Sequence, residues 1–339
     1  MKKELPFISN PSMVSYPFYG CFLGILEACN IDASTLMFNH YLTLFYGMQL
    51  HYLFIWGGFV AGGALRKLFC TEKVETLGDN PISFVKCCVD QNKYLTIVMN
   101  AKYIKPEYYT KDWLHEWMVY GYDDEANAFL VVGYARQSSD TTTIRFHEAQ
   151  VSYENFVLAL PSKKVATGLN GLMDKIFHIS VGFDYYMNST LYWLSPQVKV
   201  EKINIPRIRR NIFLYAHNVL PFMFNARIYL IYIKHMKAHR DSSFCFDLRS
   251  FRTLLEHKQI MLSLLQHLAP FEDFTKDYEE IFWAAKSILY IALKYNVAKD
   301  FSVVRKKTAT DKICFYFQKL HDKERYILMR AYAYLKNQK

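Results

Sequence analysis

The spacing of hydrophobic residues changes near residue 200. Before that point, short stretches rich in β-branched and aromatic residues predict β-strands. These stretches cover residues 94–99, 116–122, 129–134 and 142–146. The two middle stretches flank the polar sequence Asp123-Asp124-Glu125, so they predict an antiparallel hairpin. Residues 152–160 predict a helix with Ser152 at its N-cap, a position where serine is favoured.

A helix is also expected near the beginning of the chain, within residues 13–30. Four apolar residues share one face of it at helical spacing: Phe22, Ile25, Leu26 and Cys29. Cys21 lies at the first turn of this predicted helix. A helix followed by an antiparallel meander is typical of the α+β class.

After residue 206 the apolar residues repeat at helical spacing. Three long segments show this pattern, residues 247–268, 278–295 and 310–335, and Asp247 is the expected N-cap of the first. Long amphipathic helices joined by short polar loops predict a helical bundle or cap. We therefore expect an α+β domain with an antiparallel sheet over residues 1–200, followed by a mainly α-helical C-terminal region over residues 201–339.

The composition favours a compact globular protein, because 52% of the residues are hydrophobic and 17% are aromatic. The lysines at the start are not followed by the apolar segment of a secretory signal. The longest apolar run, residues 52–65, is shorter than the roughly 20 residues that span a membrane. We expect a cytoplasmic protein without a membrane span. Seven cysteines without a CxxC pair indicate reduced thiols.

Positive charge is concentrated in one segment. The net charge is +10, and residues 199–240 contain nine Lys or Arg against one acid. A basic face favours an acidic protein, a nucleic acid or an anionic membrane, and a solvated face balanced by acids elsewhere would have the same composition. No nucleic-acid-binding motif is present. We expect an acidic partner such as an acyl carrier protein and no nucleic acid, with Arg207, Arg209 and Arg210 as candidate contacts.

A cysteine and a histidine form the candidate catalytic centre. Cys21 lies near a helix start, where the helix N-terminus lowers the pKa of a thiol and favours the nucleophilic thiolate. His115 heads the first strand of the hairpin and shares a face with Trp117, opposite Glu116. Cysteine and histidine are also found in protein cores, so a structural role for each is the alternative.

A third residue usually orients the imidazole of such a pair. On the returning strand Gly133 stands where an Asp or Asn would be expected. The nearest polar residues are Gln137 after the strand and Asp123 at the turn, which are the candidate orienting residues. His235 and His239 have the spacing of two metal ligands on a helix, but no third ligand accompanies them, so we expect neither a metal nor another cofactor.

Several stretches of the sequence resemble a known family. The sequence HEWMVYGYDDEANAFLVVGY and the following VSYENF are similar to the hairpin and helix of the butirosin biosynthesis protein H-like family. Residues 246–268, 278–297 and 321–328 resemble the helical C-terminal part of related proteins found beside nonribosomal peptide synthetases. The resemblance covers about residues 112–156 and 246–333.

The resemblance implies a papain-like, cysteine-peptidase-type fold for the N-terminal domain and an acyltransferase activity. Such an enzyme moves an acyl group from a carrier-protein thioester, through a cysteine, to an amine on a natural-product intermediate. Cys21 would be the nucleophile and His115 the base. Two alternatives stay open: a non-catalytic papain-like accessory protein that binds a peptide intermediate or a synthetase domain, and a cysteine peptidase.

Overall fold

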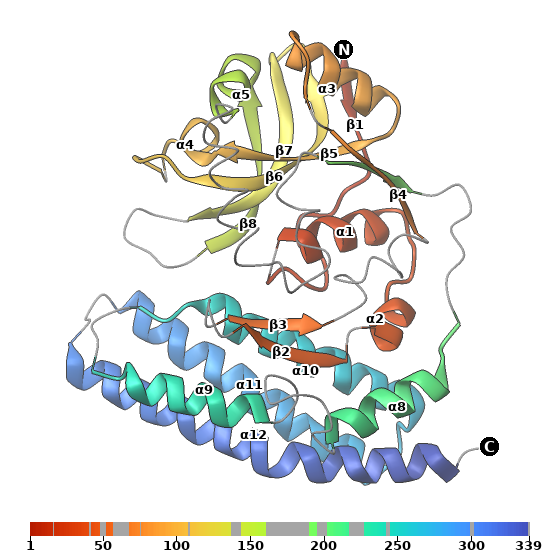
Figure 1. Cartoon of the computed structure of the whole chain (residues 1–339), viewed down its shortest axis with the longest axis vertical. Helices are drawn as coiled ribbons and strands as arrows, with labels where there is room; N and C mark the ends of the chain where they lie inside the picture. Colours follow the sequence, from red (N-terminus) through yellow and green to blue (C-terminus); the bar gives the residue numbers. More distant parts are fainter. Residues whose placement is uncertain are drawn as a thin grey trace. The chain divides into compact units, whose positions relative to one another are not determined.

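The computed structural model describes residues 1–15, 17–40, 42–47, 52–56, 68–74, 76–107, 109–136, 144–160, 190–194, 202–216, 227–241, 245–298 and 302–337. The chain forms two compact units (Figure 1). Residues 1–33 and 58–200 make up the sheet unit, and residues 34–57 and 201–339 make up the helical unit. The expected division placed residues 34–57 in the first domain, whereas the structure groups them with the helices.

The sheet unit contains an antiparallel sheet of seven described strands, in the order β4-β9-β5-β6-β7-β8 with β1 beside β6. The strands are β1 (Lys2–Glu4), β4 (Phe69–Lys73), β5 (Tyr94–Asn100), β6 (Leu114–Asp123), β7 (Ala128–Arg136), β8 (Ile144–Ser152) and β9 (Thr190–Leu194). The predicted hairpin is confirmed as β6 and β7, which pair antiparallel across a bulge between Val119 and Gly121. β5 confirms the strand predicted at residues 94–99.

Four described helices belong to this unit: α1 (Pro17–Ala28), α3 (Pro81–Asp90), α4 (Ala101–Ile104) and α5 (Tyr153–Ala159). Ser152 caps α5 as predicted, because its hydroxyl accepts a hydrogen bond of 3.2 Å from the backbone N–H of Asn155. Asn80 caps α3 in the same way through the N–H of Ser83, at 3.0 Å. These caps fix where each helix leaves the preceding chain.

The strand register assigns side chains to the two faces of the sheet. Trp117 pairs with Gly133 and Tyr122 with Phe129, and residues directly opposite each other point to the same face. The ring of Phe129 packs against Phe156 of α5, with ring centroids 4.7 Å apart. This side of the sheet is called the α5 face.

α1 packs against the other side of the sheet, called the α1 face. Leu95 of β5 belongs to the α5 face and pairs with Leu191 of β9, so Leu194 points the opposite way. Phe69 of β4 pairs with Leu194 and therefore also points away from α5. Its ring contacts Phe22 of α1, with ring centroids 4.9 Å apart. Helices therefore cover both faces, and α1 and α5 lie on opposite sides.

The helical unit combines a short N-terminal insertion with long C-terminal helices. Its elements are α2 (Ser34–His40), the hairpin of β2 (Thr43–Gly47) and β3 (Tyr52–Trp56), and α8 (Ile205–Ala216), α9 (Arg227–Ala238), α10 (Leu248–Leu268), α11 (Asp273–Val297) and α12 (Val303–Asn337). α10, α11 and α12 confirm the three predicted helices, and Asp247 caps α10 as expected. α12 packs against α8, α9 and α11, so it is the central helix of the unit.

The apolar stripes that predicted these helices form the core of the helical unit. Leu254, Ile281, Ile288, Ile313 and Phe317 are all fully buried. Burial of such side chains is the main favourable contribution to folding. Within the described ranges, no helix is long and apolar enough to cross a membrane.

Candidate functional site

Cys21 lies on α1, as predicted, but deeper in the helix than expected. α1 begins at Pro17, so Cys21 is its fifth residue, and only 4% of its surface is exposed. The electrostatic effect of a helix N-terminus is strongest in the first turn. A thiol beyond that turn and inside the core has the features of a structural cysteine.

His115 is the second residue of β6 and lies on the α5 face. It pairs with Met99 of β5 and stands two positions before Trp117, which fixes the side of the sheet to which it points. Its Nδ1 atom lies 3.2 Å from the carbonyl oxygen of Glu116. Helix α1, which carries Cys21, therefore packs against the face of the sheet opposite to the one where His115 points.

Glu116 points to the α1 face. A catalytic pair of Cys21 and His115 would have required His115 to point to that face. Removal from water raises the pKa of its carboxyl group to about 8. At this end of β6, the ionisable side chain on the α1 face is therefore the carboxyl group of Glu116 and not the imidazole of His115. Strand alternation alone placed these two neighbours on opposite faces, but it could not indicate which face α1 would cover.

Gly133 is needed because the indole ring of Trp117 covers it. A Cβ atom added at Gly133 would lie 2.7 and 2.8 Å from atoms of this ring, and 2.9 Å from the carbonyl oxygen of Glu116. Trp117 is fully buried, so its ring has little room to move. The position predicted for an orienting Asp or Asn therefore has no space for any side chain.

Asp123 stabilises the hairpin turn instead of a histidine. Its carboxylate accepts hydrogen bonds from the backbone N–H groups of Glu125 and Ala126, at 3.0 and 3.2 Å. It stands eight residues from His115 on β6, or about 27 Å at ~3.4 Å per residue. Asp123 therefore cannot orient the ring of His115, which corrects that expectation. Gln137, the other candidate, lies outside the described residues.

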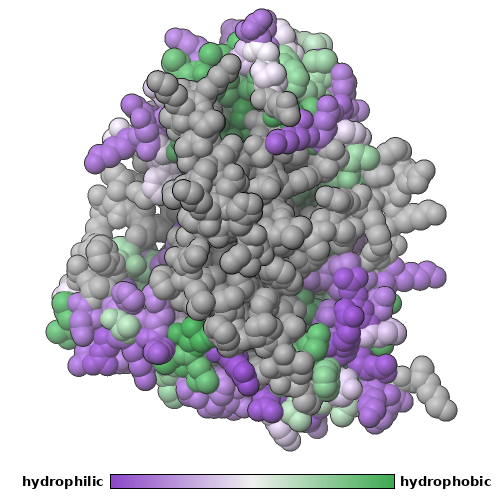
Figure 2. Space-filling view, in the orientation of Figure 1, coloured by the Kyte–Doolittle hydropathy of each residue, from purple (hydrophilic) through white to green (hydrophobic). Residues whose placement is uncertain are grey.

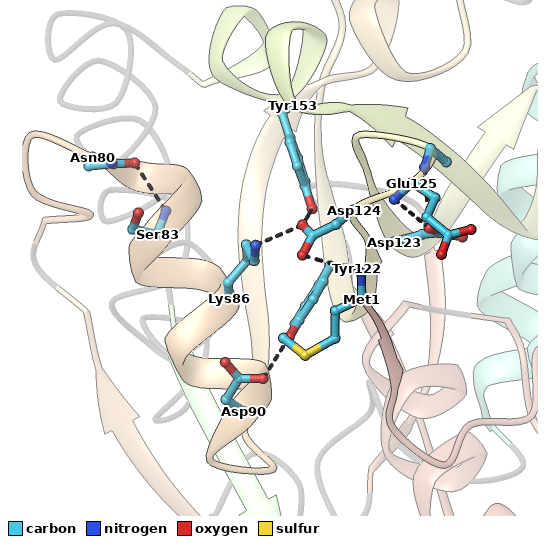
Figure 3. Close-up of polar contacts among 11 residues, drawn as sticks. Met1, Asn80, Ser83, Lys86, Asp90, Tyr122, Asp123, Asp124, Glu125 and Tyr153 are labelled. Carbon is cyan, nitrogen blue, oxygen red and sulfur yellow. Dashed lines mark hydrogen bonds and ion pairs between the residues drawn. The ribbon is translucent and has the colours of Figure 1, made fainter.

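The neighbouring residue Asp124 joins three elements to the turn (Figure 3). Its carboxylate accepts hydrogen bonds from Lys86 of α3 at 2.7 Å and from Tyr153 of α5 at 2.8 Å, and the amino terminus of Met1 lies 3.9 Å away. The hydrogen bond from Lys86 is the largest influence that lowers the pKa of Asp124. The acidic turn thus has a structural role in holding α3, α5 and β1 to the hairpin.

The three arginines expected to contact a partner lie on α8. Arg210 is exposed, Arg207 and Arg209 are half-buried, and none of the three forms an ion pair with another described residue. α9 is basic as well, and neither α8 nor α9 contains an acidic residue. On the face that Figure 2 shows, the coloured residues of the helical unit are largely hydrophilic, with hydrophobic side chains between them.

The two histidines with metal-ligand spacing lie on and just beyond α9. The ring centroids of His235 and His239 are 4.5 Å apart. Nδ1 of His239 lies 3.0 Å from the carbonyl oxygen of His235, so it bonds within the helix end. Among the described residues, no group of three His, Cys, Asp or Glu side chains is placed to hold a metal ion.

The predictions from sequence missed a polar cluster that surrounds Glu324 in the core of the helical unit. Its carboxylate oxygen Oε1 accepts hydrogen bonds from Lys258, at 2.7 Å, and from Tyr278. Oε2 accepts hydrogen bonds from Tyr229 and Tyr215, at 2.5 and 3.1 Å. Each of α8, α9, α10, α11 and α12 supplies at least one member of this cluster.

Burial controls the protonation of this cluster. Removal from water lowers the pKa of Lys258, and the Glu324 carboxylate opposes that change. The pKa of His257 is well below its usual value, first because the ring is buried and then because of the charge of Lys258, while an interaction with the Leu42 main chain acts in the opposite direction. All of these side chains are closed off from solvent, so the cluster connects helices and cannot meet a substrate.

A signal in the sequence could have revealed this cluster. Glu324 interrupts the apolar stripe of α12 between Leu320 and Ile327, and Lys258 interrupts that of α10 between Leu254 and Met261. A charged residue at core spacing on each of two helices indicates a buried pair, since lone buried charges are rare.

Gly133→Ala should destabilise the sheet unit by about 1–3 kcal/mol, because the new methyl group would overlap the ring of Trp117. Urea unfolding measures this loss. In a Trp117→Leu background the same substitution should cost less, because the indole has been removed. Equal losses in the two backgrounds would contradict the packing of Trp117 over Gly133.

Glu324→Ala should cost about 3–5 kcal/mol of unfolding free energy, because Lys258 would become a buried charge without its partner. The double variant Lys258→Met/Glu324→Leu should recover much of this loss by removing both charges. Glu280→Ala is the matched control, since Glu280 pairs with Lys319 and Lys323 at the surface and should be nearly silent. Similar losses for Glu280→Ala and Glu324→Ala would show that the cluster is not a special contributor.

The helical unit should lose stability as the pH falls below about 6.5, the ordinary pKa of histidine. Below that pH the unfolded chain binds a proton at His257, whereas the folded protein, in which this pKa is far lower, does not. The expected slope is up to about 1.4 kcal/mol per pH unit. His257→Gln should remove this part of the slope in urea unfolding between pH 7.5 and 5. An unchanged slope would mean that His257 binds its proton equally well in the folded state.

Comparison with known proteins places this chain in no family. No protein-family model matches the sequence, and no curated protein gives a significant match. The resemblance to butirosin biosynthesis protein H-like proteins therefore stays a prediction.

Proposed function

We propose that this protein is a non-catalytic accessory protein of nonribosomal peptide biosynthesis. On this proposal it keeps a papain-like α+β scaffold and binds a peptide intermediate or an acidic synthetase domain. The observation that carries the proposal is the placement of Cys21 and His115: α1 packs against one face of the sheet, and His115 points to the other. A thiolate–imidazole pair needs contact between the two groups.

Two further observations support a binding role. Trp117 fills the space that an orienting residue would need, so a third catalytic member cannot come from Gly133. The excess of positive charge also lies in one unit: residues 34–57 and 201–339 contain 25 Lys or Arg and 13 Asp or Glu, whereas the remaining residues contain 16 and 18. A net charge of +12 on one unit attracts acidic surfaces and speeds association with them.

Acyl transfer through Cys21 remains the competing prediction, and mass spectrometry of the intact protein distinguishes the two. After incubation with an aminoacyl thioester, the proposed binding protein should show no added acyl mass. Binding to carrier domains in a pull-down should be unchanged by Cys21→Ser and by His115→Ala.

An acyl adduct that disappears in the Cys21→Ser variant would overturn the binding proposal in favour of acyl transfer. A thioester-reactive cysteine acyltransferase, assayed in parallel, shows that the substrate is competent. Binding that is lost in both variants would also count against the proposal, because it would place the partner at the predicted dyad.

A further inference from the structure

The outer side of α11 exposes a row of large apolar side chains. Trp283, Tyr290 and Val297 are 56%, 59% and 60% exposed, although the opposite side of the same helix is buried against its neighbours. They are separated by seven residues each, which is the spacing of one seam position in a coiled coil. Isolated apolar residues at a surface are ordinary, but an aligned row of large ones marks an interaction site.

Lysines are interleaved with this row. The ammonium group of Lys286 lies 4.4 Å from the ring centroid of Trp283 and 6.0 Å from that of Tyr290, so a cation joins the two aromatic rings. Lys294 follows on the same side of the helix and is exposed. No acidic residue occurs between Ile281 and Ala298. The row is therefore both apolar and positively charged.

α12 adds an aromatic residue beside this row. Glu280 of α11 pairs with Lys319 and Lys323 of α12, at 3.4 and 2.8 Å, and the two helices run antiparallel. Phe315 stands four residues before Lys319 and eight before Lys323, so on the antiparallel helix it lies one to two turns past Glu280, between the levels of Trp283 and Tyr290. It is 66% exposed. Aromatic side chains from two neighbouring helices thus border the same strip of surface.

We propose that this strip, from Trp283 to Val297, is a docking surface for an acidic amphipathic helix of another protein. The inference rests on the proposed binding function and names the surface and the chemistry of the partner. The strip is straight and about 21 Å long, at ~1.5 Å per residue, which fits one helix of about four turns. Acidic residues beside the apolar seam of that helix would pair with Lys286 and Lys294.

A second copy of this chain fits the strip less well than an acidic helix does. Self-association through α11 would bring Lys286 and Lys294 of one copy against those of the other, and like charges across an interface are unfavourable. An acidic helix relieves the same repulsion. The apolar row alone would fit either partner, and charge complementarity favours the acidic helix over a second copy of this chain.

The test measures binding of the full chain to two fluorescent peptides by anisotropy. Both are 21-residue amphipathic helices with a leucine seam, one with Glu and the other with Lys on its flanks. The Glu peptide should bind, and Trp283→Ala/Tyr290→Ala should weaken it at least tenfold. Phe271→Ala should have no effect, because Phe271 is 92% exposed but lies before α11 and outside the strip.

Reversing the charge of the two lysines tests the proposed charge complementarity directly. Lys286→Glu/Lys294→Glu should lose the Glu peptide and gain the Lys peptide, which a merely unfolded variant could not do. Arg207→Ala/Arg210→Ala on α8, which changes the other basic surface, should reduce affinity for the Glu peptide much less than Trp283→Ala/Tyr290→Ala does, because the peptide docks on α11. Circular dichroism melting of each variant confirms that it is folded.

Several results would overturn the proposal. These are failure of the Glu peptide to bind, binding that is unaffected by Trp283→Ala/Tyr290→Ala, or loss of binding only in the α8 variant. Trp283-dependent binding of phosphatidylserine vesicles or of a thymidine oligonucleotide, with no peptide binding, would assign the strip to a membrane or to nucleic acid instead. Concentration-dependent dimerisation that Trp283→Ala abolishes would assign it to self-association. An acyl adduct on Cys21 would refute the accessory function but leave the peptide result intact.

Discussion

The helical unit depends on the carboxylate of Glu324. An ionised carboxylate in a protein core is strongly unfavourable unless each lone pair finds a donor. Here each oxygen accepts two hydrogen bonds, Oε1 from Lys258 and Tyr278, and Oε2 from Tyr215 and Tyr229. Because these donors come from four different helices, sliding any one of them along α12 would leave a donor buried without its acceptor. The cost of such a slip, rather than the strength of the ion pair, is what would fix the alignment of the helices.

The sheet unit depends on a constraint of a different kind, the parity of its strand register. Side chains alternate between the two faces, so a shift of one residue would exchange His115 with Glu116 and Trp117 with Met118. Trp117 prevents that shift, because its indole fits only over a residue without a side chain, and Gly133 supplies one. The same contact that sets the register therefore also removes the place for a catalytic orienting residue. At position 133, packing beneath Trp117 and a side chain that could orient His115 exclude each other.

Sequence patterns predicted the local structure well where one residue type decides it. Ser152 and Asp247 identified the starts of α5 and α10 because a short polar side chain at an N-cap satisfies backbone N–H groups that nothing else nearby can reach. The alternation around the turn predicted β6 and β7 for the same local reason. These predictions needed only neighbours a few residues apart.

Predictions that depended on distant parts of the chain were less successful. Periodicity placed His115 and Glu116 on opposite faces of β6, but which face α1 covers depends on contacts such as Phe22 with Phe69, 47 positions apart in the sequence. The structure groups residues 34–57 with the C-terminal helices, and a short helix and a hairpin carry no local signal of such a long-range grouping. The polar cluster escaped notice because its members stand in apolar stripes, where burial outweighs residue type.

The distribution of charge in the helical unit connects its interior with its surface. Among the described residues of this unit, the buried charged side chains balance, with Lys258 and Lys306 against Glu256 and Glu324. The net charge of +12 must therefore lie outside the core, where like charges repel one another and lower the stability of the compact state. This repulsion is strongest where basic residues have no acidic neighbours on the same helix. Such stretches are α8, α9 and the part of α11 without acidic residues. Such a surface lowers the free energy of unfolding of the unit. An acidic partner would reduce the repulsion between the like charges on binding. The same lysines and arginines would then link stability to recognition.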